Sequence, residues 1–286
     1  MYNSDMVLYF ISNYLPLRSA PDKMIDNNIR TDYNKLRHLI RLDKRFGTNA
    51  SIIQEIVNNG ETTAVIKDAF PAEDIAKPDN FKSLLYYFGL LSIKGTKRGD
   101  TLLGVPNLTV REQLYTYLIE AYREADVFSI ELYKLHDLVK DMAYDGDWKP
   151  VFEYFSSELE RQSAIREFIE GEAHVKGFLL AYLGLTRTYI IYPEYDEANK
   201  GYADFYMMPD LIHQPEIGFS YIVEVKYARR DASETEIEAL RAEAAIQLRC
   251  YAADPKVHAT KGDTELRLVT LVFKGWKLAV CEMDLA

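Results

Sequence analysis

The stretch that most constrains the fold spans residues 201–226 and reads GYADFYMMPDLIHQPEIGFSYIVEVK. Two apolar runs separated by a polar turn predict two neighbouring β-strands. Charged residues nevertheless stand inside these runs, with Asp204 at the start of the first and Glu224 and Lys226 at the end of the second. A charge in a buried strand is costly to desolvate unless it is paired or binds a metal. The sequence therefore predicts a functional site within the sheet.

The expected geometry brings the two carboxylates together. If residues 202–208 and 219–228 form an antiparallel hairpin, Asp204 falls within one residue of Glu224 across the pair. Glu224 and Lys226 are two residues apart and face the same side of the sheet. Converging carboxylates suit Mg²⁺ or Mn²⁺, which prefer oxygen ligands and lower the pKa of a bound water. Lys226 would orient that water or neutralise developing charge, which makes phosphodiester hydrolysis the leading interpretation.

A more literal acidic candidate is Asp210, which follows Pro209 directly. In the same hairpin Asp210 pairs near Ile217, which lies about seven residues, or roughly 23 Å of extended chain, from Glu224. The spacing therefore favours Asp204 as the ligand.

The overall composition predicts a globular protein with a sizeable core, since 48% of its 286 residues are hydrophobic. The net charge of −10 argues against a non-specific nucleic-acid coat but does not exclude a nuclease. Its two cysteines have neither disulfide nor metal-ligand spacing. With no apolar run of membrane-spanning length and no secretory signal, we expect a cytoplasmic location and no membrane partner.

The first part of the chain, residues 1–150, is predicted to be a helical, winged-helix-like domain. A β-hairpin is expected at residues 91–105, with KGTKRGD as its turn. Its basic tip is either a nucleic-acid contact or simply a solvated turn. A capping box at Thr109 is expected to start the helix that follows. Helices are predicted at residues 3–16, 26–46, 50–59, 80–91, 109–125, 129–144 and 148–160, and the basic tip residues are Lys94, Lys97 and Arg98.

The second part, residues 151–286, is predicted to be an α/β domain with the order α-β-β-β-α-β-β. A capping box, S-E-T-E, marks the start of its second helix. No glycine-rich phosphate loop occurs in the sequence, so nucleotide hydrolysis is not expected. The predicted elements are a helix at 163–185, strands at 188–194, 202–208 and 219–228, a helix at 233–253, and strands at 266–274 and 277–283.

These pieces carry a family resemblance. The E-x-K of YIVEVKY follows the acidic strand of GYADFYMMP, with EAHVKGFLLAYL before them and AAIQLRCYA after them. This arrangement resembles the PD-(D/E)xK nuclease superfamily, which implies a restriction-endonuclease-like αβββαβ core in an α+β chain. With NSDMVLYF, IRTDYNKLRHLIR and FKSLLYYFGLLSI, the chain more narrowly resembles a bacterial family whose nuclease-like domains follow an AAA-type ATPase module. The first part would then be the helical region after an ATPase core that this sequence lacks.

The resemblance assigns roles to individual residues. It implies that Asp204 and Glu224 bind the metal, Mg²⁺ or Mn²⁺, and that Lys226 is the catalytic lysine. Glu172 on the preceding helix would be an additional acidic residue, and Gln247 on the following helix an auxiliary polar residue.

Each role has a structural alternative. Asp204, Glu224 and Lys226 would otherwise form a buried ion-pair network, while Glu172 and Gln247 would be ordinary helix-surface residues. His174 is interpreted as a partly buried structural histidine. Two functions follow: a Mg²⁺-dependent endo- or exonuclease acting on DNA or RNA, or a catalytically weak or inactive module that partners an AAA-type ATPase. The substrate and the oligomeric state are left open.

Overall fold

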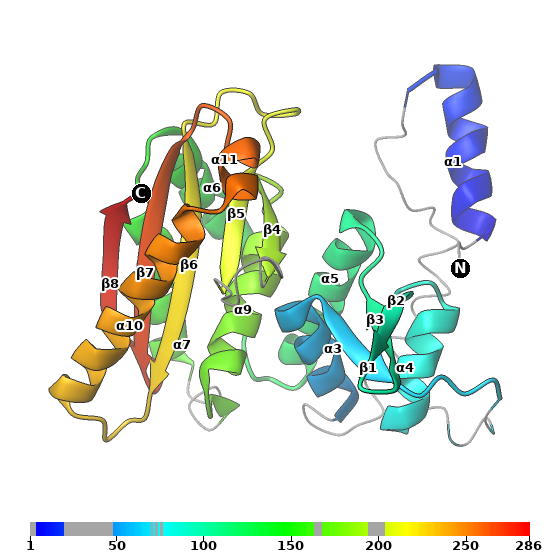
Figure 1. Ribbon diagram of the computed structural model, residues 1–286, viewed down its shortest axis with the longest axis horizontal. Coiled ribbons are helices and arrows are strands. Elements are labelled where there is room, and N and C mark those ends of the chain that lie inside the picture. The colour runs from blue at the N-terminus through cyan, green and yellow to red at the C-terminus, as the bar shows by residue number, and fades with distance from the viewer. Residues whose placement is uncertain are drawn as a thin grey trace. The chain divides into compact units, whose positions relative to one another are not determined.

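The computed structural model divides the chain into two compact units, Met1–Ala125 and Asp126–Ala286, here called the N-terminal and C-terminal units (Figure 1). The predicted helix at 26–46 and the turn at 194–201 lie outside the described residues. The structure describes residues 4–19, 48–69, 71, 74, 77–162, 168–193 and 204–286.

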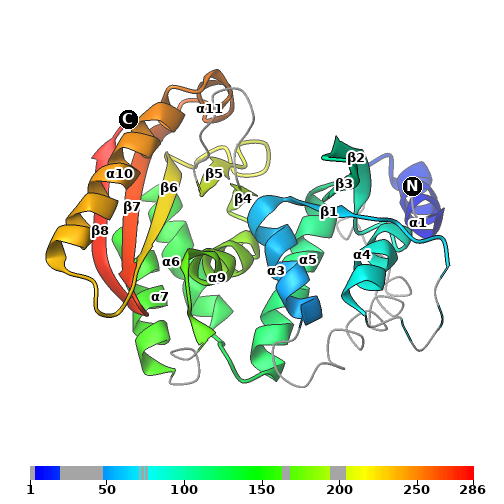
Figure 2. The same ribbon diagram turned by 60° about the horizontal axis from the view of Figure 1, so that its bottom comes forward.

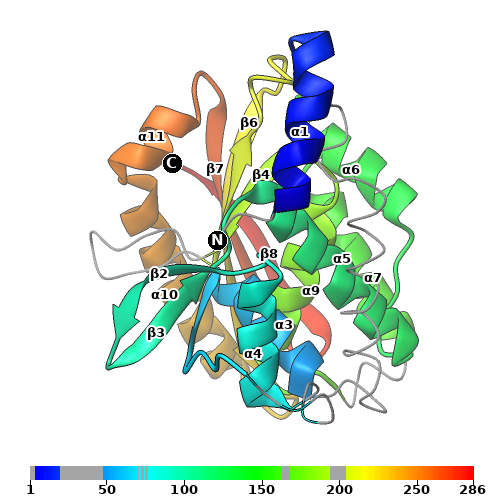
Figure 3. The ribbon, with the colours of Figure 1, turned by 90° about the vertical axis from the view of Figure 1, so that its right-hand side faces the viewer.

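The N-terminal unit combines helices with a three-stranded antiparallel sheet of order β1-β3-β2. Figure 3 shows this sheet beside α3 and α4. The first strand was not predicted from the sequence, and the assignment of this unit as winged-helix-like stays a prediction. Its elements are α1 (Ser4–Leu17), α3 (Thr48–Asn59), β1 (Glu61–Ala64), α4 (Pro78–Tyr87), β2 (Ser92–Lys97), β3 (Asp100–Gly104) and α5 (Leu108–Glu124).

The β2–β3 hairpin is confirmed, but its predicted long turn is wrong. The strands pair as far as Lys97 and Asp100, which leaves a two-residue turn. Arg98 and Gly99 both have positive φ, at 55° and 95°, the backbone that a tight turn of this length requires. The tip charge is partly neutralised, because Lys97 Nζ lies 3.1 Å from Glu61 Oε1.

The start of α5 also differs from its prediction. The helix begins at Leu108, and the Asn107 side chain accepts a hydrogen bond from the Val110 N–H. The capping box expected at Thr109 is therefore wrong. Asn is among the strongest N-cap residues. Because Asn107 is the N-cap of this helix, Thr109 lies inside its first turn and does not cap it.

The C-terminal unit follows the predicted order of elements, with the short helix α11 added. Its helices are α6 (Leu132–Tyr144), α7 (Lys149–Arg161), α9 (Glu172–Gly184), α10 (Glu234–Ala252) and α11 (Pro255–Thr260). Its strands are β4 (Tyr189–Pro193), β5 (Phe205–Pro209), β6 (Phe219–Ala228), β7 (Glu265–Lys274) and β8 (Lys277–Leu285).

One five-stranded mixed sheet, β4-β5-β6-β7-β8, organises this unit. Only β6 and β7 are parallel, so the chain must cross over between them, and α10 makes that crossing. Figure 2 shows α10 on one face of the sheet, with α6, α7 and α9 on the other. The capping box at the start of α10 is confirmed, because Ser233 Oγ accepts from the Glu236 N–H and the Glu236 carboxylate accepts from the Ser233 N–H.

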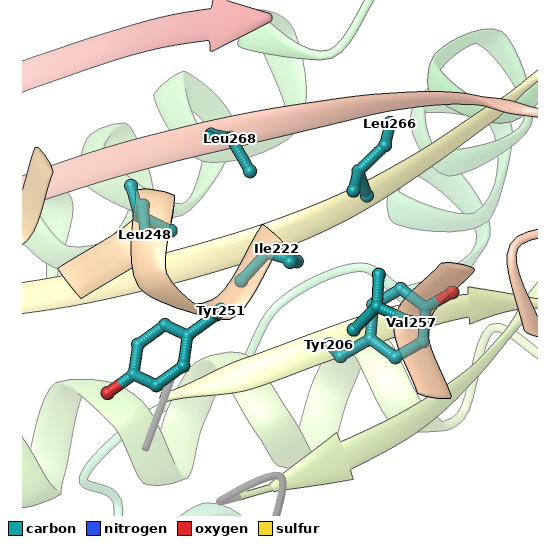
Figure 4. Packing of buried hydrophobic residues seen from close by; sticks show 7 residues of the cluster. All are labelled: Tyr206, Ile222, Leu248, Tyr251, Val257, Leu266 and Leu268. Carbon is teal, nitrogen blue, oxygen red and sulfur yellow. The ribbon is translucent and has the colours of Figure 1, made fainter. Parts of the chain in front are cut away.

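A hydrophobic cluster packs between the sheet and α10. It joins side chains from β5, β6, β7, α10 and α11 (Figure 4). The members are Tyr206, Ile222, Leu248, Tyr251, Val257, Leu266 and Leu268. This packing fixes α10 against β6, the strand that carries the E-x-K residues.

The two units divide ahead of the boundary expected at residues 150/151. Helices α6 and α7 contact β6 and β8, and the Tyr221 hydroxyl donates to the Met142 carbonyl at 2.8 Å. These long-range contacts tie both helices to the C-terminal sheet. Among the helices of the described residues, none is long and apolar enough to cross a membrane.

The helix predicted over residues 163–185 is interrupted within its described part, residues 168–185. Ile169 and Glu170 are not helical, and α9 begins at Glu172 after Gly171. Glycine disfavours helix interiors, while an acidic residue in the first turn complements the helix dipole. Glu172 therefore lies at the N-terminus of α9 rather than in mid-helix.

Candidate active site

Asp204 and Glu224 meet where the pairing between β5 and β6 ends. The Asp204 N–H donates to Glu224 Oε2 at 3.2 Å, and Asp204 Oδ2 accepts from the Val225 N–H at 2.7 Å. The last pair in the ladder is Phe205 with Val223. Each carboxylate therefore takes up a backbone N–H that the strand pairing leaves free, and the structure brings together the two acids expected from the sequence.

The alternation of β6 places Glu224 on the α10 face of the sheet. Tyr206 pairs with Ile222, and both belong to the hydrophobic cluster beneath α10. Glu224 lies two residues after Ile222 and shares that face, whereas Asp204 stands immediately before β5 and also reaches Lys176 of α9. The site therefore continues the packed core at one end and is held by a rigid strand.

Two lysines neutralise the two carboxylates. Lys226 Nζ lies 3.0 Å from Glu224 Oε1, and Lys176 Nζ lies 3.1 Å from Asp204 Oδ1. The relative exposures are 2% for Glu224, 6% for Lys176, 7% for Asp204 and 8% for Lys226. Ion pairs this deep are not surface pairs, and removing one partner would leave an uncompensated buried charge.

Glu243 on α10 joins the same group. Its Oε1 lies 3.2 Å from Lys226 Nζ, so the lysine bridges β6 to the covering helix. Burial lowers the pKa of Lys226, but the neighbouring Glu224 and Glu243 carboxylates outweigh burial and raise it. Lys226 is therefore a cation at neutral pH.

Burial and the nearby Asp204 carboxylate raise the pKa of Glu224 to about 7, against the lowering effect of Lys226. This Glu is therefore only partly ionised near neutral pH. A strongly perturbed carboxyl with a specific charged neighbour is typical of functional sites.

Glu172, at the first turn of α9, lies within the field of the same charges. Its pKa is raised by burial and by Asp204, and is lowered by Lys226 and Lys176. Glu172 therefore shares the electrostatic environment of this cluster, and its role in the site stays a prediction. The alternative of a fully solvated helix face does not fit a half-buried side chain.

Gln247 falls beside the site along α10. Glu243, one helical turn before it, contacts Lys226, whereas Leu248 and Tyr251 pack over Ile222. Residues four apart share a helix face, which puts Gln247 on the Glu243 face, alongside the Glu224 part of β6. Its Oε1 is buried and accepts no hydrogen bond from the described residues.

Two other candidates lie away from this cluster. Asp210 follows β5 and its carboxylate contacts His213 Nδ1 at 2.8 Å within the turn. His174 packs its ring edge-on against Phe168, with centroids 4.8 Å apart, and burial lowers its pKa. The His174 contact agrees with its interpretation as a partly buried structural histidine, and Asp210 lies in the turn, as the hairpin spacing predicts.

Sequence reasoning missed Lys176 and Glu243. Each had a usable signal, because Lys176 stands one turn after Glu172 in an otherwise apolar helix. Glu243 stands one turn before Gln247. A charged residue one turn from a suspected site residue is therefore itself a candidate on that face.

The donor set fits a hard divalent cation. Asp204 and Glu224 supply carboxylate oxygens, each with a second lone pair beyond its present hydrogen bond. Gln247 supplies a buried oxygen that no described residue hydrogen-bonds. Within the part of the chain that is described, no three His, Cys, Asp or Glu residues form a closed ligand group. Mg²⁺ commonly binds through one or two carboxylates and keeps several waters, so two acids suffice.

A mixed five-stranded sheet between α9 and α10 is consistent with a restriction-endonuclease-like core, with Glu224 and Lys226 on β6 and Asp204 immediately before β5. Residues 170–283 match the sequence model of the PD-(D/E)XK nuclease superfamily, which confirms the resemblance over that range. Nucleases of this superfamily generally use divalent metals. No curated protein sequence matches the chain.

Proposed function

We propose that the C-terminal unit is a metal-dependent nuclease that hydrolyses phosphodiester bonds of DNA or RNA. The observation that carries the proposal is the buried convergence of Asp204 and Glu224, with Lys226 on the same strand face. Two converging buried acids are costly unless cations compensate them, and this pair lies inside the range that matches the nuclease superfamily.

The residues divide the work by position. Asp204 and Glu224 would hold Mg²⁺ or Mn²⁺, and the bound cation supplies an acidified water and charge stabilisation at the phosphate. Lys226, already cationic, would neutralise the charge that develops on the phosphate oxygens. Glu172 would add negative charge at the N-terminus of α9. Gln247 Oε1, which accepts no hydrogen bond from the described residues, would accept one from water or substrate.

A cleavage assay tests this function. The full chain is incubated with Mg²⁺ or Mn²⁺ and with single- and double-stranded DNA and RNA, including circular single-stranded DNA, which has no end for an exonuclease. Glu224→Gln and Lys226→Met should each lower the rate by about a hundredfold or more. Asp210→Asn is the matched control and should cleave like the wild type, because its carboxylate contacts His213 instead. Activity that persists in both site variants would contradict the assignment of Glu224 and Lys226 to the active site.

A second function is favoured by one observation. All four carboxylate oxygens of Asp204 and Glu224 already contact a donor of the chain itself. A cluster satisfied in this way keeps its shape without a cation, as expected of an inactive module that partners an AAA-type ATPase. The winged-helix-like N-terminal unit would then supply the assembly surface. Failure to cleave any substrate, with no Mn²⁺ binding by the wild-type chain, would select this alternative.

A further inference from the structure

Lys176 is a buried ammonium that the E-x-K motif does not account for. It stands in α9 between Val175 and Gly177, in a stretch of side chains that are almost all buried. Its own exposure is 6%, and its Nζ lies 3.1 Å from Asp204 Oδ1. A buried lysine of this kind is rarely tolerated without a specific partner, so the contact with Asp204 is the main feature to explain.

Each of the two deepest carboxylates has its own lysine. Lys226 contacts Glu224 and Lys176 contacts Asp204, at nearly equal distances of 3.0 and 3.1 Å. Lys226 also reaches the half-exposed Glu243 on α10, so it has a second carboxylate partner when Glu224 is engaged elsewhere. Lys176 places its positive charge directly at an oxygen expected to bind a cation.

We propose that Lys176 is a built-in counter-ion of Asp204, which takes the electrostatic place of the divalent cation and thereby sets the affinity for that cation. This inference rests on the proposed function of the same site. A cation bound to Asp204 must approach the Lys176 ammonium or displace it, and like charges a few ångströms apart in a buried site repel strongly. Without a cation, the same ammonium spares Asp204 from being a buried, unpaired charge.

Two roles of the Lys176–Asp204 ion pair predict different effects of removing Lys176. If Lys176 only supports the fold, its removal weakens the protein and leaves cation affinity unchanged or lowered. If Lys176 stands in for the cation, its removal leaves Asp204 unpaired, so that the cation becomes both better bound and more stabilising.

The test measures Mn²⁺ binding by titration calorimetry, and the rise in Tm on adding Mn²⁺, for the full chain. Lys176→Met removes the charge at similar volume, while Lys176→Gln also keeps a hydrogen-bond donor near Asp204. Both variants should bind Mn²⁺ about tenfold more tightly or better than the wild type, with a larger rise in Tm. Lys149→Met is the control, because Lys149 pairs with Glu153 on the surface, and its affinity should equal that of the wild type. Glu224→Gln should lose binding, which ties the signal to this site.

The outcomes separate the inference from the proposed function. Wild-type binding that depends on Glu224, with equal or weaker binding in both Lys176 variants, would overturn the inference and leave the nuclease proposal standing. Binding by the Lys176 variants but not by the wild type would support the inference and count against a metal-dependent activity of the natural chain. Absence of binding in every protein would remove both. Lys176 variants that stay unfolded even with saturating Mn²⁺ would also overturn the inference, because the cation then does not replace the ammonium.

Discussion

The raised pKa of Glu224 predicts a specific pH dependence of stability in the metal-free protein. Folding raises this pKa from an ordinary value of 4.5 to about 7. Between these values the folded chain holds a proton that the unfolded chain has lost. The contribution of Glu224 to stability is therefore present below about pH 4.5 and is lost as the pH rises to about 7. The shift corresponds to about 3 kcal/mol.

Glu224→Gln isolates this contribution, because glutamine does not titrate. The difference in unfolding free energy between the variant and the wild type should move by about 3 kcal/mol in favour of the variant between pH 4.5 and pH 8. Urea unfolding in the presence of EDTA measures it, followed by tryptophan fluorescence. Both tryptophans, Trp148 and Trp276, lie in the C-terminal unit, so the signal reports the unit that contains the site.

A difference that stays constant over this pH range would refute the reasoning, since Glu224 would then titrate alike in the folded and unfolded chains. Saturating Mn²⁺ supplies an internal check. A bound cation favours the ionised carboxylate, so it should flatten the wild-type pH dependence. The Glu224→Gln profile should not respond to Mn²⁺.

Three further predictions concern the packing and capping that position the site and its neighbouring unit. Leu248→Ala should lower the unfolding free energy by about 2–5 kcal/mol in urea unfolding. Ile246→Ala is the control, because Ile246 is 64% exposed. Equal losses of unfolding free energy in the two variants would contradict the packing of Leu248 in the core. Asn107→Ala should cost about 1 kcal/mol in thermal unfolding followed by circular dichroism, whereas Thr109→Ala should not; a larger loss at Thr109 would restore the capping box first expected there. Ser233→Ala should cost a similar amount in the tryptophan-detected unfolding, and no loss would show that the α10 capping box does not matter.

The sequence sufficed where the signal was local. Alternation along β6 placed Glu224 and Lys226 on one face, and hairpin counting selected Asp204 over Asp210. The S-E-T-E box at Ser233 was predicted because a capping box involves only four consecutive residues. In each case the interacting groups are close in sequence or are related by a simple strand pairing.

The features that the sequence does not predict depend on contacts between residues far apart in the chain. The Lys176–Asp204 ion pair joins α9 to the residue before β5. These two residues are far apart in sequence and belong to no common helix or strand pair, so no sequence pattern predicts their contact. The boundary predicted at residues 150/151 lies after the division that the structure shows at 125/126. In sequence α6 and α7 resemble the helices before them, and only their contacts with β6 and β8 assign them to the C-terminal unit. The start of α9 depends on an interruption at Gly171, and the helix-like mixture of apolar and charged residues on both sides of this glycine gives no sign of it.

The position of the charges on β6 has a consequence for how such a protein can evolve. This strand is paired on both sides and packed by α10, so the fold is specified by apolar contacts that do not require Glu224. Because Lys226 also pairs with Glu243, replacing Glu224 by glutamine leaves the lysine a partner and removes a carboxyl whose pKa folding raises. Above about pH 7, stability should then rise, while the proposed cleavage would be lost. If the C-terminal unit is the nuclease proposed above, one substitution at Glu224 would end cleavage without unfolding the protein. Catalytic and non-catalytic forms of this architecture would then be separated by a step that increases stability.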